Sequence, residues 1–300
     1  MRRTRTLAGI GIAAVTLLAL TACNSGSPET PGGDAGGDAE EPSTWFEVAS
    51  DVSLEGSPTF DAMTERDGVV VGVKEDQPGL GYLDVTTGER TGFDIDIARW
   101  IAASLGFDED KIEFKPIASA NREQAITNGD IDYYVGTYSI TDKRKELIDF
   151  AGPYFITGQG LLVGADTEGV EKLEDLNGKT VCSATGSTPI QNIKANFPEI
   201  TPKEYDLYSA CVEDLINGQV DAVTTDQAIL IGFAAQYPED VKVVGDLFTE
   251  ERYGVGFTKG DSALQEHINT LFTDGGDIWQ AIFDKNLGDS GIKVEQPAVD

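Results

Sequence analysis

A repeat within the chain limits its fold more than any other feature. Residues 123–137, EQAITNGDIDYYVGT, align without a gap with residues 212–226, VEDLINGQVDAVTTD, at an offset of 89 positions. Each copy has a short amphipathic stretch that ends at Asn-Gly, where the glycine suits the left-handed backbone that often follows a helix. An apolar run comes next and ends in small polar residues, so each copy predicts a helix followed by a strand.

The segments before the two copies repeat as well, because each copy is preceded by a predicted strand, a helix and a second strand. These three elements span residues 68–73, 94–106 and 111–117 before the first copy and residues 178–185, 190–197 and 203–208 before the second. Strands that alternate with helices at these lengths are typical of parallel α/β units. The sequence therefore predicts an α/β fold of two similar lobes with mainly parallel sheets.

The repeat pairs Thr137 with Asp226, because each residue ends the strand of its own copy. Ligands of parallel α/β sheets bind outside the carboxyl ends of the strands. We therefore expect these two residues to face each other across a ligand cleft between the lobes. The predicted helices over 262–272 and 277–288 have no counterpart in the repeat, and we expect them to cover the first lobe.

The first 22 residues have the layout of an export signal. A basic start, MRRTR, is followed by an apolar stretch that is too short for a membrane-spanning helix and ends in small residues. Residues 20–23, LTAC, resemble a bacterial lipobox, in which Cys23 carries the lipid; an ordinary secretory signal is the alternative. Residues 24–65 contain ten acidic residues and no basic one, so we expect residues 23–56 to form a flexible acidic tether.

The charge of the chain excludes one class of partner. The sequence has 52 acidic and 22 basic residues, which gives a net charge of −30. Removal of residues 1–22 takes away three arginines, so 19 basic residues remain and the charge becomes −33. Nucleic acid is not an expected partner, because phosphate binding needs a basic surface.

Two cysteines remain once Cys23 is assigned to lipid. Cys182 and Cys211 form an even pair in an exported protein, where disulfides persist. We expect them to form a disulfide, which on chain-entropy grounds stabilises a fold by roughly 3 to 4 kcal/mol for a loop of about 30 residues. Two buried free thiols are the alternative.

Few residues could support catalysis. The only histidine is His267, in the predicted helix over 262–272, so a Ser-His-Asp or Cys-His arrangement has no suitable base. One histidine and two cysteines also leave zinc without its usual ligands. We therefore expect no enzyme activity, no metal and no cofactor. The turn ATGSTP, residues 184–189, puts hydroxyl and N–H groups at a predicted helix start, where it forms either an anion site or a plain turn.

The stretch TYSITDKR, residues 137–144, is cationic and rich in hydroxyls within an acidic chain. Thr141 suits a helix N-cap, and residues 145–150 look like the first turns of that helix. Arg144 then lies in the first turn, where the helix dipole disfavours a cation. A bound carboxylate explains this placement, because a guanidinium can donate to both oxygens. A helix start with solvated charges is the alternative.

Several motifs resemble a known family, the solute-binding proteins of ABC importers for polar amino acids. That family has a type II periplasmic-binding-protein fold with two α/β lobes joined by hinge strands. The resemblance covers residues 60–288. It rests on TGFDIDIARWIA (91–102), NGDIDYYVGTYSITDKR (128–144), GPYF (152–155), ATGST (184–188), GQVDAVTTD (218–226) and YGVGFTKGD (253–261). The motifs KEDQPGLG (74–81), VCSATGSTP (181–189) and YSACVEDL (208–215) further resemble glutamate-binding lipoproteins.

The resemblance implies how the backbone end of an amino acid is held. It implies contacts from Arg144, Ser139, Thr185 and Gly186 to the α-carboxylate and from Asp226, the Thr137 carbonyl and the Ser139 hydroxyl to the α-ammonium. The repeat had independently paired Thr137 with Asp226. The two arguments therefore lead to the same pair of residues.

The resemblance assigns side-chain specificity to Lys74, Ser119 and Arg122, which match the positions that hold the distal carboxylate of glutamate or aspartate. A solvated strand end for Lys74 and a surface charge for Arg122 are the alternatives. Together with Arg144, the three cations against Asp226 give a local charge of +2, which complements an acidic amino acid. We expect glutamate first and aspartate next; a glutamine or asparagine binder, or a dehydratase on the same fold, are the alternatives.

The resemblance also implies a place and a mechanism. The protein is expected to be a monomeric lipoprotein on the outer face of the cytoplasmic membrane, held there by its lipid anchor, that closes around its ligand and delivers it to the membrane permease of an ABC importer. The first lobe is expected to comprise residues 57–157 and 254–300, and the second residues 158–253. The chain is expected to cross between them near 157–161 and 250–254.

Overall fold

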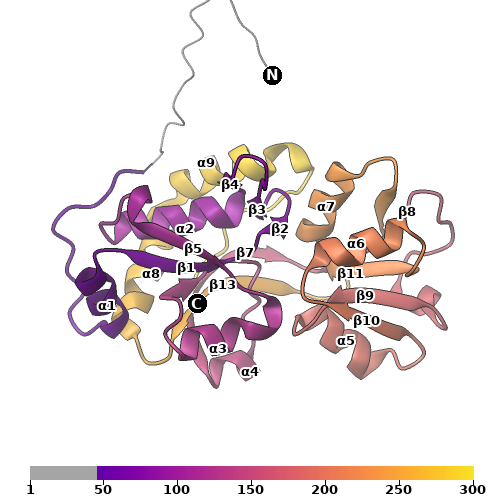
Figure 1. Ribbon diagram of the computed structural model, residues 1–300, viewed down its shortest axis with the longest axis horizontal. Helices are drawn as coiled ribbons and strands as arrows, with labels where there is room; N and C mark the ends of the chain where they lie inside the picture. Colours follow the sequence, from indigo (N-terminus) through magenta and orange to yellow (C-terminus); the bar gives the residue numbers. More distant parts are fainter. Residues whose placement is uncertain (1–45) are drawn as a thin grey trace, which may run out of the picture. The chain divides into compact units, whose positions relative to one another are not determined.

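The computed structural model describes residues 46–300 (Figure 1). These residues contain two five-stranded mixed β-sheets. The first sheet has the strand order β5 (Ile112–Pro116), β1 (Val69–Val73), β6 (Tyr133–Tyr134), β13 (Glu251–Thr258) and β7 (Ile148–Thr157). β1 runs parallel to β5 and to β6, while β13 runs antiparallel to β6 and to β7. The parallel pairing brings the carboxyl ends of β1, β5 and β6 to one edge.

The second sheet repeats this pattern. Its strand order is β10 (Thr201–Tyr205), β9 (Thr180–Ala184), β11 (Ala222–Asp226), β8 (Gln159–Gly164) and β12 (Val241–Val244). β9 runs parallel to β10 and β11, and β8 runs antiparallel to β11 and β12. The strands of the two repeat copies, β6 and β11, therefore hold the same central position in their sheets, which confirms the predicted two-lobed α/β fold.

The helices of the repeat end as the sequence predicts. The first copy contains α3 (Arg122–Thr127) and the second α6 (Tyr208–Ile216). Each is followed by Asn-Gly, and Gly129 and Gly218 have φ angles of 70° and 67°. A glycine adopts this left-handed backbone without the strain that a Cβ would add.

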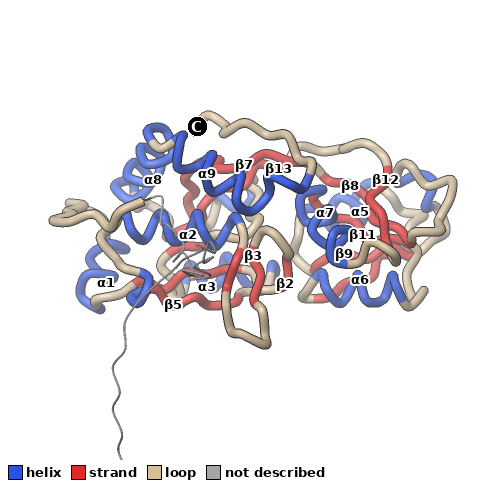
Figure 2. Tube along the Cα trace, turned by 90° about the horizontal axis from the view of Figure 1, so that it is seen from above, coloured by secondary structure: helices blue, strands red, loops and turns tan. Residues whose placement is uncertain are grey.

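Further helices cover the sheets (Figures 1 and 2). The predicted C-terminal helices do cover the first sheet, since the Trp279 indole N–H of α9 donates to the Tyr154 carbonyl of β7 at 2.8 Å. The α-helices not yet given are α1 (Pro58–Arg66), α2 (Phe93–Ser104), α4 (Asp142–Lys145), α5 (Thr188–Asn196), α7 (Gln227–Gln236), α8 (Ser262–Asp274) and α9 (Gly276–Leu287). The short 3-10 helices are η1 (Glu109–Lys111), η2 (Ser119–Asn121), η3 (Leu173–Leu176) and η4 (Gly288–Ser290). A small antiparallel sheet consists of β2 (Asp76–Gln77), β3 (Gly81–Leu83) and β4 (Arg90–Thr91).

The chain passes from the first sheet to the second between β7 and β8 and returns between β12 and β13. Glu251 of β13 lies opposite Thr157 of β7, so the two crossings are neighbours. We propose that these crossings bound the lobes, with residues 57–157 and 254–300 in the first lobe and residues 158–253 in the second.

Two local expectations differ from the structure. The helix expected over 145–150 does not extend that far, because α4 is a single turn and β7 begins at Ile148, which pairs with Thr258 of β13. Sheet pairing thus overrides the local helix signal. Thr141 does cap this turn, since its hydroxyl accepts from the Arg144 N–H at 3.3 Å.

The second difference concerns the part of the expected tether that the structure describes, residues 46–56. Phe46, Val52 and Leu54 are partly buried against the main hydrophobic cluster, and the Ala49 N–H donates to the Ala103 carbonyl at 2.9 Å. These residues therefore lie against the first lobe. Apolar side chains lie between the acidic residues of this segment, and they supply the buried surface that a count of charges does not register. The export signal, Cys23 and the tether up to residue 45 lie outside the described residues.

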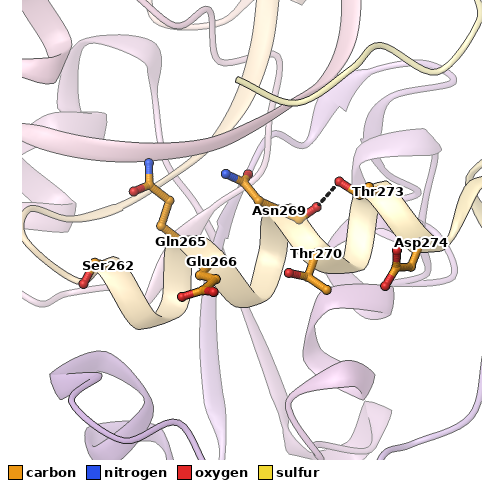
Figure 3. Close-up of a pocket in the computed structure, with 7 residues that line it drawn as sticks. All are labelled: Ser262, Gln265, Glu266, Asn269, Thr270, Thr273 and Asp274. Carbon is orange, nitrogen blue, oxygen red and sulfur yellow. Dashed lines mark hydrogen bonds between the residues drawn. The ribbon is translucent and has the colours of Figure 1, made fainter.

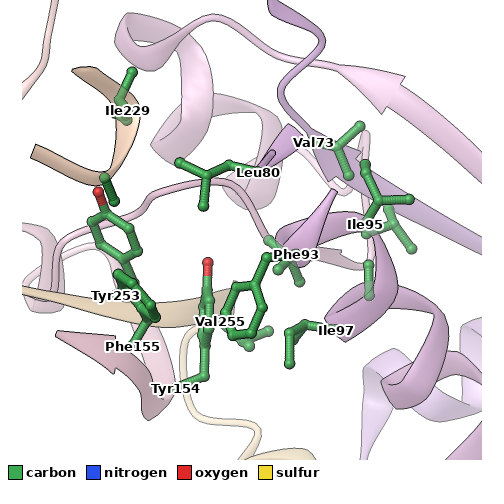
Figure 4. Packing of buried hydrophobic residues seen from close by; sticks show 14 of the residues in the cluster. Val73, Leu80, Phe93, Ile95, Ile97, Tyr154, Phe155, Ile229, Tyr253 and Val255 are labelled. Carbon is green, nitrogen blue, oxygen red and sulfur yellow. The ribbon is translucent and has the colours of Figure 1, made fainter. Parts of the chain in front are cut away.

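The main hydrophobic cluster joins residues of both lobes. In the first lobe Phe93 packs edge-on against Trp279, with ring centroids 5.7 Å apart, and Val73 belongs to the same cluster. In the second lobe the cluster includes Ile229 of α7, which Figure 4 shows across from Leu80. The lobes are therefore in apolar contact. Within residues 46–300, no helix is both long and apolar enough to span a membrane.

A disulfide joins Cys182 of β9 to Cys211 of α6, with their Cα atoms 5.5 Å apart, as the sequence predicts. Replacing both cysteines with alanine is expected to lower the free energy of unfolding by roughly 3 to 4 kcal/mol, because the bond restricts the unfolded chain over a separation of 29 residues. Denaturant unfolding at constant pH measures this change. Reduced wild-type protein is the control, since it keeps both sulfur atoms; an unfolding midpoint equal to that of the oxidised protein contradicts the prediction.

Candidate functional site

A small cavity lies between the lobes, where the carboxyl ends of the parallel strands meet. Its volume is about 10 Å³, so the lobes are packed tightly around it. Thr137, which follows β6, and Asp226, which ends β11, both line it, so the pair expected from the repeat does meet. The cavity is lined by Ser119, Arg122, Thr137, Ser139 and Arg144 of the first lobe and by Ser187, Thr188, Pro189, Tyr208, Asp226 and Ile229 of the second.

The Arg144 guanidinium bridges the lobes. Its Nη1 donates to the Ser139 carbonyl at 2.7 Å in the first lobe, and its Nη2 donates to the Gly186 carbonyl at 3.2 Å in the second. Its Nε donates to Glu123 at 3.2 Å. Burial, and then the positive charge of Arg122, lower the pKa of Arg144 from its ordinary value. The group is thus oriented by both lobes and has little water to stabilise its charge.

Arg122 and Arg144 both lie close to the ring of Tyr138. Arg122 donates from Nε to the Ser119 carbonyl at 3.1 Å and from Nη1 to the Thr137 carbonyl at 3.3 Å. Its guanidinium carbon lies 4.1 Å from the ring centroid of Tyr138, and that of Arg144 lies 4.8 Å from the same centroid. The ring attracts both cations through its negative faces, which offsets part of their mutual repulsion.

Lys74 ends β1 and is almost fully buried, at 3% exposure. Its Nζ donates to the Ser119 hydroxyl at 2.7 Å. Burial, and then the charge of Arg122, lower the pKa of Lys74 to about 7. Lys74 does not itself line the cavity among the described residues, and it reaches the cavity wall through Ser119.

Asp226 is the acidic residue of the cavity wall. Its Oδ2 accepts from the Tyr253 hydroxyl at 2.7 Å, and its Oδ1 is buried without a hydrogen-bond partner. Asp226 directly precedes α7, yet its side chain does not cap that helix. Burial, and then the charge of Glu251, raise the pKa of Asp226 to about 8. A buried carboxylate oxygen with no partner favours binding of a donor, above all a cationic one.

The backbone at Thr137 is held in an unusual conformation, with a φ angle of 46°. A left-handed backbone costs a β-branched residue free energy, so other contacts must hold it. The Thr137 N–H donates to Asp94 at 3.0 Å, and its hydroxyl donates to Gln77 at 3.2 Å. Asp94 also accepts from the Tyr154 hydroxyl at 2.8 Å. This network turns the Thr137 carbonyl toward Arg122.

The structure brings most of the residues expected from the sequence to one cavity. Six of them line it, Gly186 contacts Arg144, and Lys74 acts through Ser119. Thr185 lies apart, because its hydroxyl donates to the Tyr205 carbonyl at 3.2 Å. Sequence reasoning missed Ser187, Thr188, Pro189, Tyr208 and Ile229. The first three belong to the ATGSTP turn, for which the sequence had left an anion site and a plain turn open, whereas nothing in the sequence indicated Ile229.

A second hollow runs along α8 (Figure 3). Three of its polar side chains are used within the fold: Gln265 donates to the Phe150 carbonyl at 2.6 Å, and Asn269 accepts from the Gly152 N–H at 2.7 Å. Thr273 donates to the Asn269 carbonyl, as the dashed line in Figure 3 shows. The interlobe cavity therefore remains the better site. In the described part of the chain, no cluster of histidine, cysteine or acidic residues could hold a metal ion.

The cavity can bind both charges of a zwitterion. Arg122 and Arg144 present guanidinium groups, which bind carboxylates through paired N–H donors, and Asp226 presents an unpaired carboxylate oxygen. The buried ammonium of Lys74 adds a third cation behind Ser119. A two-lobed α/β architecture with such a site between the lobes defines a binding protein for a small charged solute.

The comparisons with known proteins agree with this class. The chain belongs to the bacterial extracellular solute-binding proteins of family 3, whose family model matches residues 69–288. It is 42% identical over 255 residues to the glutamate-binding protein GluB of Corynebacterium glutamicum, across 80% of this chain and 85% of that protein. It is 38% identical over 249 residues to a glutamine-binding protein of Geobacillus stearothermophilus, across 83% and 90%. Among solved structures it is similar to an ancestral arginine-binding protein bound to arginine, with a TM-score of 0.67 and 35% identity over 74% of this chain and 98% of that one. The family resemblance found in the sequence is confirmed.

The raised pKa of Asp226 predicts a pH dependence of stability. Because the folded protein favours the protonated carboxyl, the contribution of Asp226 to stability is fully present below the ordinary pKa of 3.8 and is lost as the pH rises to about 8. Asp226→Asn removes the charge and is expected to raise the thermal midpoint clearly at pH 8 but little at pH 4. Calorimetry at both pH values measures this difference. Glu239→Gln on the exposed surface is the control, and equal gains at the two pH values contradict the assignment.

Proposed function

We propose that this protein is the extracytoplasmic binding lipoprotein of an amino-acid ABC importer and that it binds an acidic amino acid, glutamate first and aspartate next. The observation that carries the proposal is the cavity in which Arg122, Arg144 and the nearby Lys74 oppose Asp226. Its net charge of +2 complements a zwitterion with one extra carboxylate. The identity to a glutamate-binding relative supports the same choice.

The backbone end of the ligand binds between the lobes. Arg144 takes the α-carboxylate, with the Ser139 hydroxyl and the turn at Gly186 beside it. Asp226 takes the α-ammonium through Oδ1, which has no partner within the protein. The Thr137 carbonyl and the Ser139 hydroxyl complete the ammonium site.

The side chain of the ligand points toward Lys74, Ser119 and Arg122. The Lys74–Ser119 hydrogen bond and the Arg122 contact to the Ser119 carbonyl bring these three groups to one wall. A distal carboxylate there meets one ammonium and one guanidinium. A neutral amide would leave the same cations without a counter-ion, at a cost that favours glutamate over glutamine.

Charge compensation explains why a ligand would drive closure. In the closed, ligand-free protein burial disfavours both the Asp226 carboxylate, with its pKa raised to about 8, and the Lys74 ammonium, with its pKa lowered to about 7. A ligand ammonium and a ligand carboxylate restore the charged forms. The ligand therefore stabilises the closed lobes over the open ones by its differential interaction with the two states.

Glutamine is the second candidate, because a glutamine-binding relative is 38% identical to this chain. Titration calorimetry with glutamate, aspartate, glutamine and asparagine tests the proposal. Tightest binding of glutamate supports it, and tightest binding of glutamine overturns the acidic specificity while leaving the amino-acid site in place. A dehydratase activity on the same fold is the remaining alternative, and turnover of cyclic precursors of aromatic amino acids would reveal it.

The cellular placement follows from the N-terminal motif. Lipid on Cys23 anchors the monomer to the outer face of the cytoplasmic membrane. Metabolic labelling with a radioactive fatty acid, compared between wild type and Cys23→Ala, tests the anchor.

Arg144→Ala and Asp226→Ala are each expected to weaken glutamate binding by about 30-fold to 5,000-fold, because removal of one partner from a buried charged pair costs about 2 to 5 kcal/mol. Titration calorimetry measures the loss. Lys145→Ala is the matched control, since Lys145 is an exposed cation on the same helical turn. An unchanged affinity for glutamate in either cavity variant would contradict the role proposed for that residue.

Lys74→Met is expected to weaken glutamate binding by more than tenfold and glutamine binding by far less, because only glutamate loses an ion pair. In the wild type, the ratio of glutamine Kd to glutamate Kd is expected to fall as the pH rises above about 7, since Lys74 then loses its proton in the ligand-free protein. Titrations at pH 6 and 9 with both ligands measure the ratio. If this Kd ratio changes with pH as much in the Lys74→Met variant as in the wild type, Lys74 is not the group that distinguishes glutamate from glutamine.

A further inference from the structure

The lobes meet at a second place outside the cavity. The short strand β2 of the first lobe, together with Pro78 that follows it, lies against α6 and α7 of the second lobe. Figures 1 and 2 show β2 on the side of the first lobe that faces these two helices. Neither Asp76 of β2 nor Gly232 of α7 is among the described residues that line the cavity. This contact therefore lies beside the ligand site, which Gln77 of β2 reaches through its hydrogen bond from the Thr137 hydroxyl.

Asp76 caps a helix of the opposite lobe. Its Oδ2 accepts from the Ser209 N–H at 3.0 Å, in the first turn of α6. The N-cap residue of that helix, Leu207, has no side chain that can accept a hydrogen bond. A carboxylate beside free N–H groups at a helix start also interacts favourably with the helix dipole. The cap of α6 thus comes from the first lobe and exists only while the lobes are together.

Gly232 allows the first lobe to come this close. A Cβ added at Gly232 would lie 2.2 Å from the Pro78 carbonyl oxygen, a distance that real Cβ atoms essentially never show. Gly232 lies in the interior of α7, where glycine is less favourable than alanine by about 1 kcal/mol. Helix stability therefore does not explain a glycine there, whereas the approach of Pro78 does.

An apolar contact extends the same surface. Ile229 lies three residues before Gly232, on the same face of α7. It belongs to the same hydrophobic cluster as Leu80, and Figure 4 shows the two side chains across from each other. Both are buried, with exposures of 1% and 0%. Residues 76–80 thus meet the second lobe through one capping bond, one backbone approach and one apolar contact.

We infer that residues 76–80 are a latch that holds the lobes closed, with Asp76 and Gly232 as positioning residues for ligand binding. The inference rests on the proposed function, because it concerns the closed state that holds the ligand. The contact of Pro78 with Gly232 acts on the lifetime of that state and not on the choice of ligand, since neither residue is among those that line the cavity. A change at Gly232 should therefore alter ligand release equally for every amino acid that binds.

Gly232→Ala is the sharpest test. Alanine favours the helix, so the ligand-free protein is expected to keep or raise its thermal midpoint. Glutamate affinity is expected to fall by about 5-fold to 150-fold, the range that corresponds to an overpacked contact, with most of the change in the dissociation rate. The ratio of glutamine Kd to glutamate Kd is expected to stay at the wild-type value. Gly288→Ala is the matched control, because Gly288 has a helical backbone and its added Cβ would come no closer than 3.9 Å to Asp284.

The capping bond can be removed from either partner. Asp76→Ala takes away the acceptor, and Ser209→Pro takes away the N–H. Ser209 is the second residue of α6, and the chain already carries Pro189 as the second residue of α5. Each variant is expected to speed ligand dissociation by about 10-fold to 150-fold, in line with the loss of a hydrogen bond to a charged group. The double variant is expected to dissociate no faster than the faster single variant, because both changes remove the same bond.

Stopped-flow dissociation rates and small-angle scattering decide the outcome. Wild-type rates in Gly232→Ala overturn the latch while leaving the proposed function intact. A changed glutamine-to-glutamate ratio also overturns it, because the change would then reach the cavity. Scattering gives the radius of gyration without ligand and with saturating glutamate. If wild type and Gly232→Ala have equal radii in both conditions, the latch is overturned, whether or not glutamate binds. A wild type that binds none of the four amino acids overturns the proposed function instead.

Discussion

The cost of burying charge between two lobes is the constraint on which the rest of this structure depends. Asp226 and Arg144 lie at the interface with almost no water, and burial alone moves the pKa values of both toward their neutral forms. An ion buried without a partner costs several kcal/mol. On the proposed function, a solute whose own charges pair with these groups offsets this cost and favours the closed lobes. Closure without a ligand leaves the cost in place.

The surrounding structure holds these charges in place by contacts that do not touch a solute. Asp94 fixes the left-handed backbone of Thr137, and the ring of Tyr138 lies close to the guanidinium groups of both Arg122 and Arg144. The disulfide of Cys211 ties α6 to β9, the strand that leads into the turn at Gly186. Rigid support of this kind lets a few polar groups select a ligand, because the groups cannot rearrange to suit a poor one.

Parts of the fold follow from local sequence, and parts do not. Asn-Gly endings and alternating strands and helices were readable because glycine conformation and side-chain periodicity are properties of a few neighbouring residues. The helix expected after Thr141 was wrong beyond one turn, because Ile148 pairs with Thr258, more than 100 residues away. The packing of Phe46 on the first lobe was missed for the same reason: a partly buried aromatic needs a surface that local composition does not reveal.

The sequence by itself determined the two-lobed architecture, the disulfide pair and the meeting of Thr137 with Asp226, since a repeat fixes equivalent strand ends and two remaining cysteines allow one bridge. Only the tertiary structure decided that Asp226 keeps an unpaired buried oxygen, that Tyr138 contacts two arginines, and that Gly232 admits Pro78. Those facts depend on distances between segments far apart in the chain. Such distances are set by how the lobes pack, and no local pattern records them.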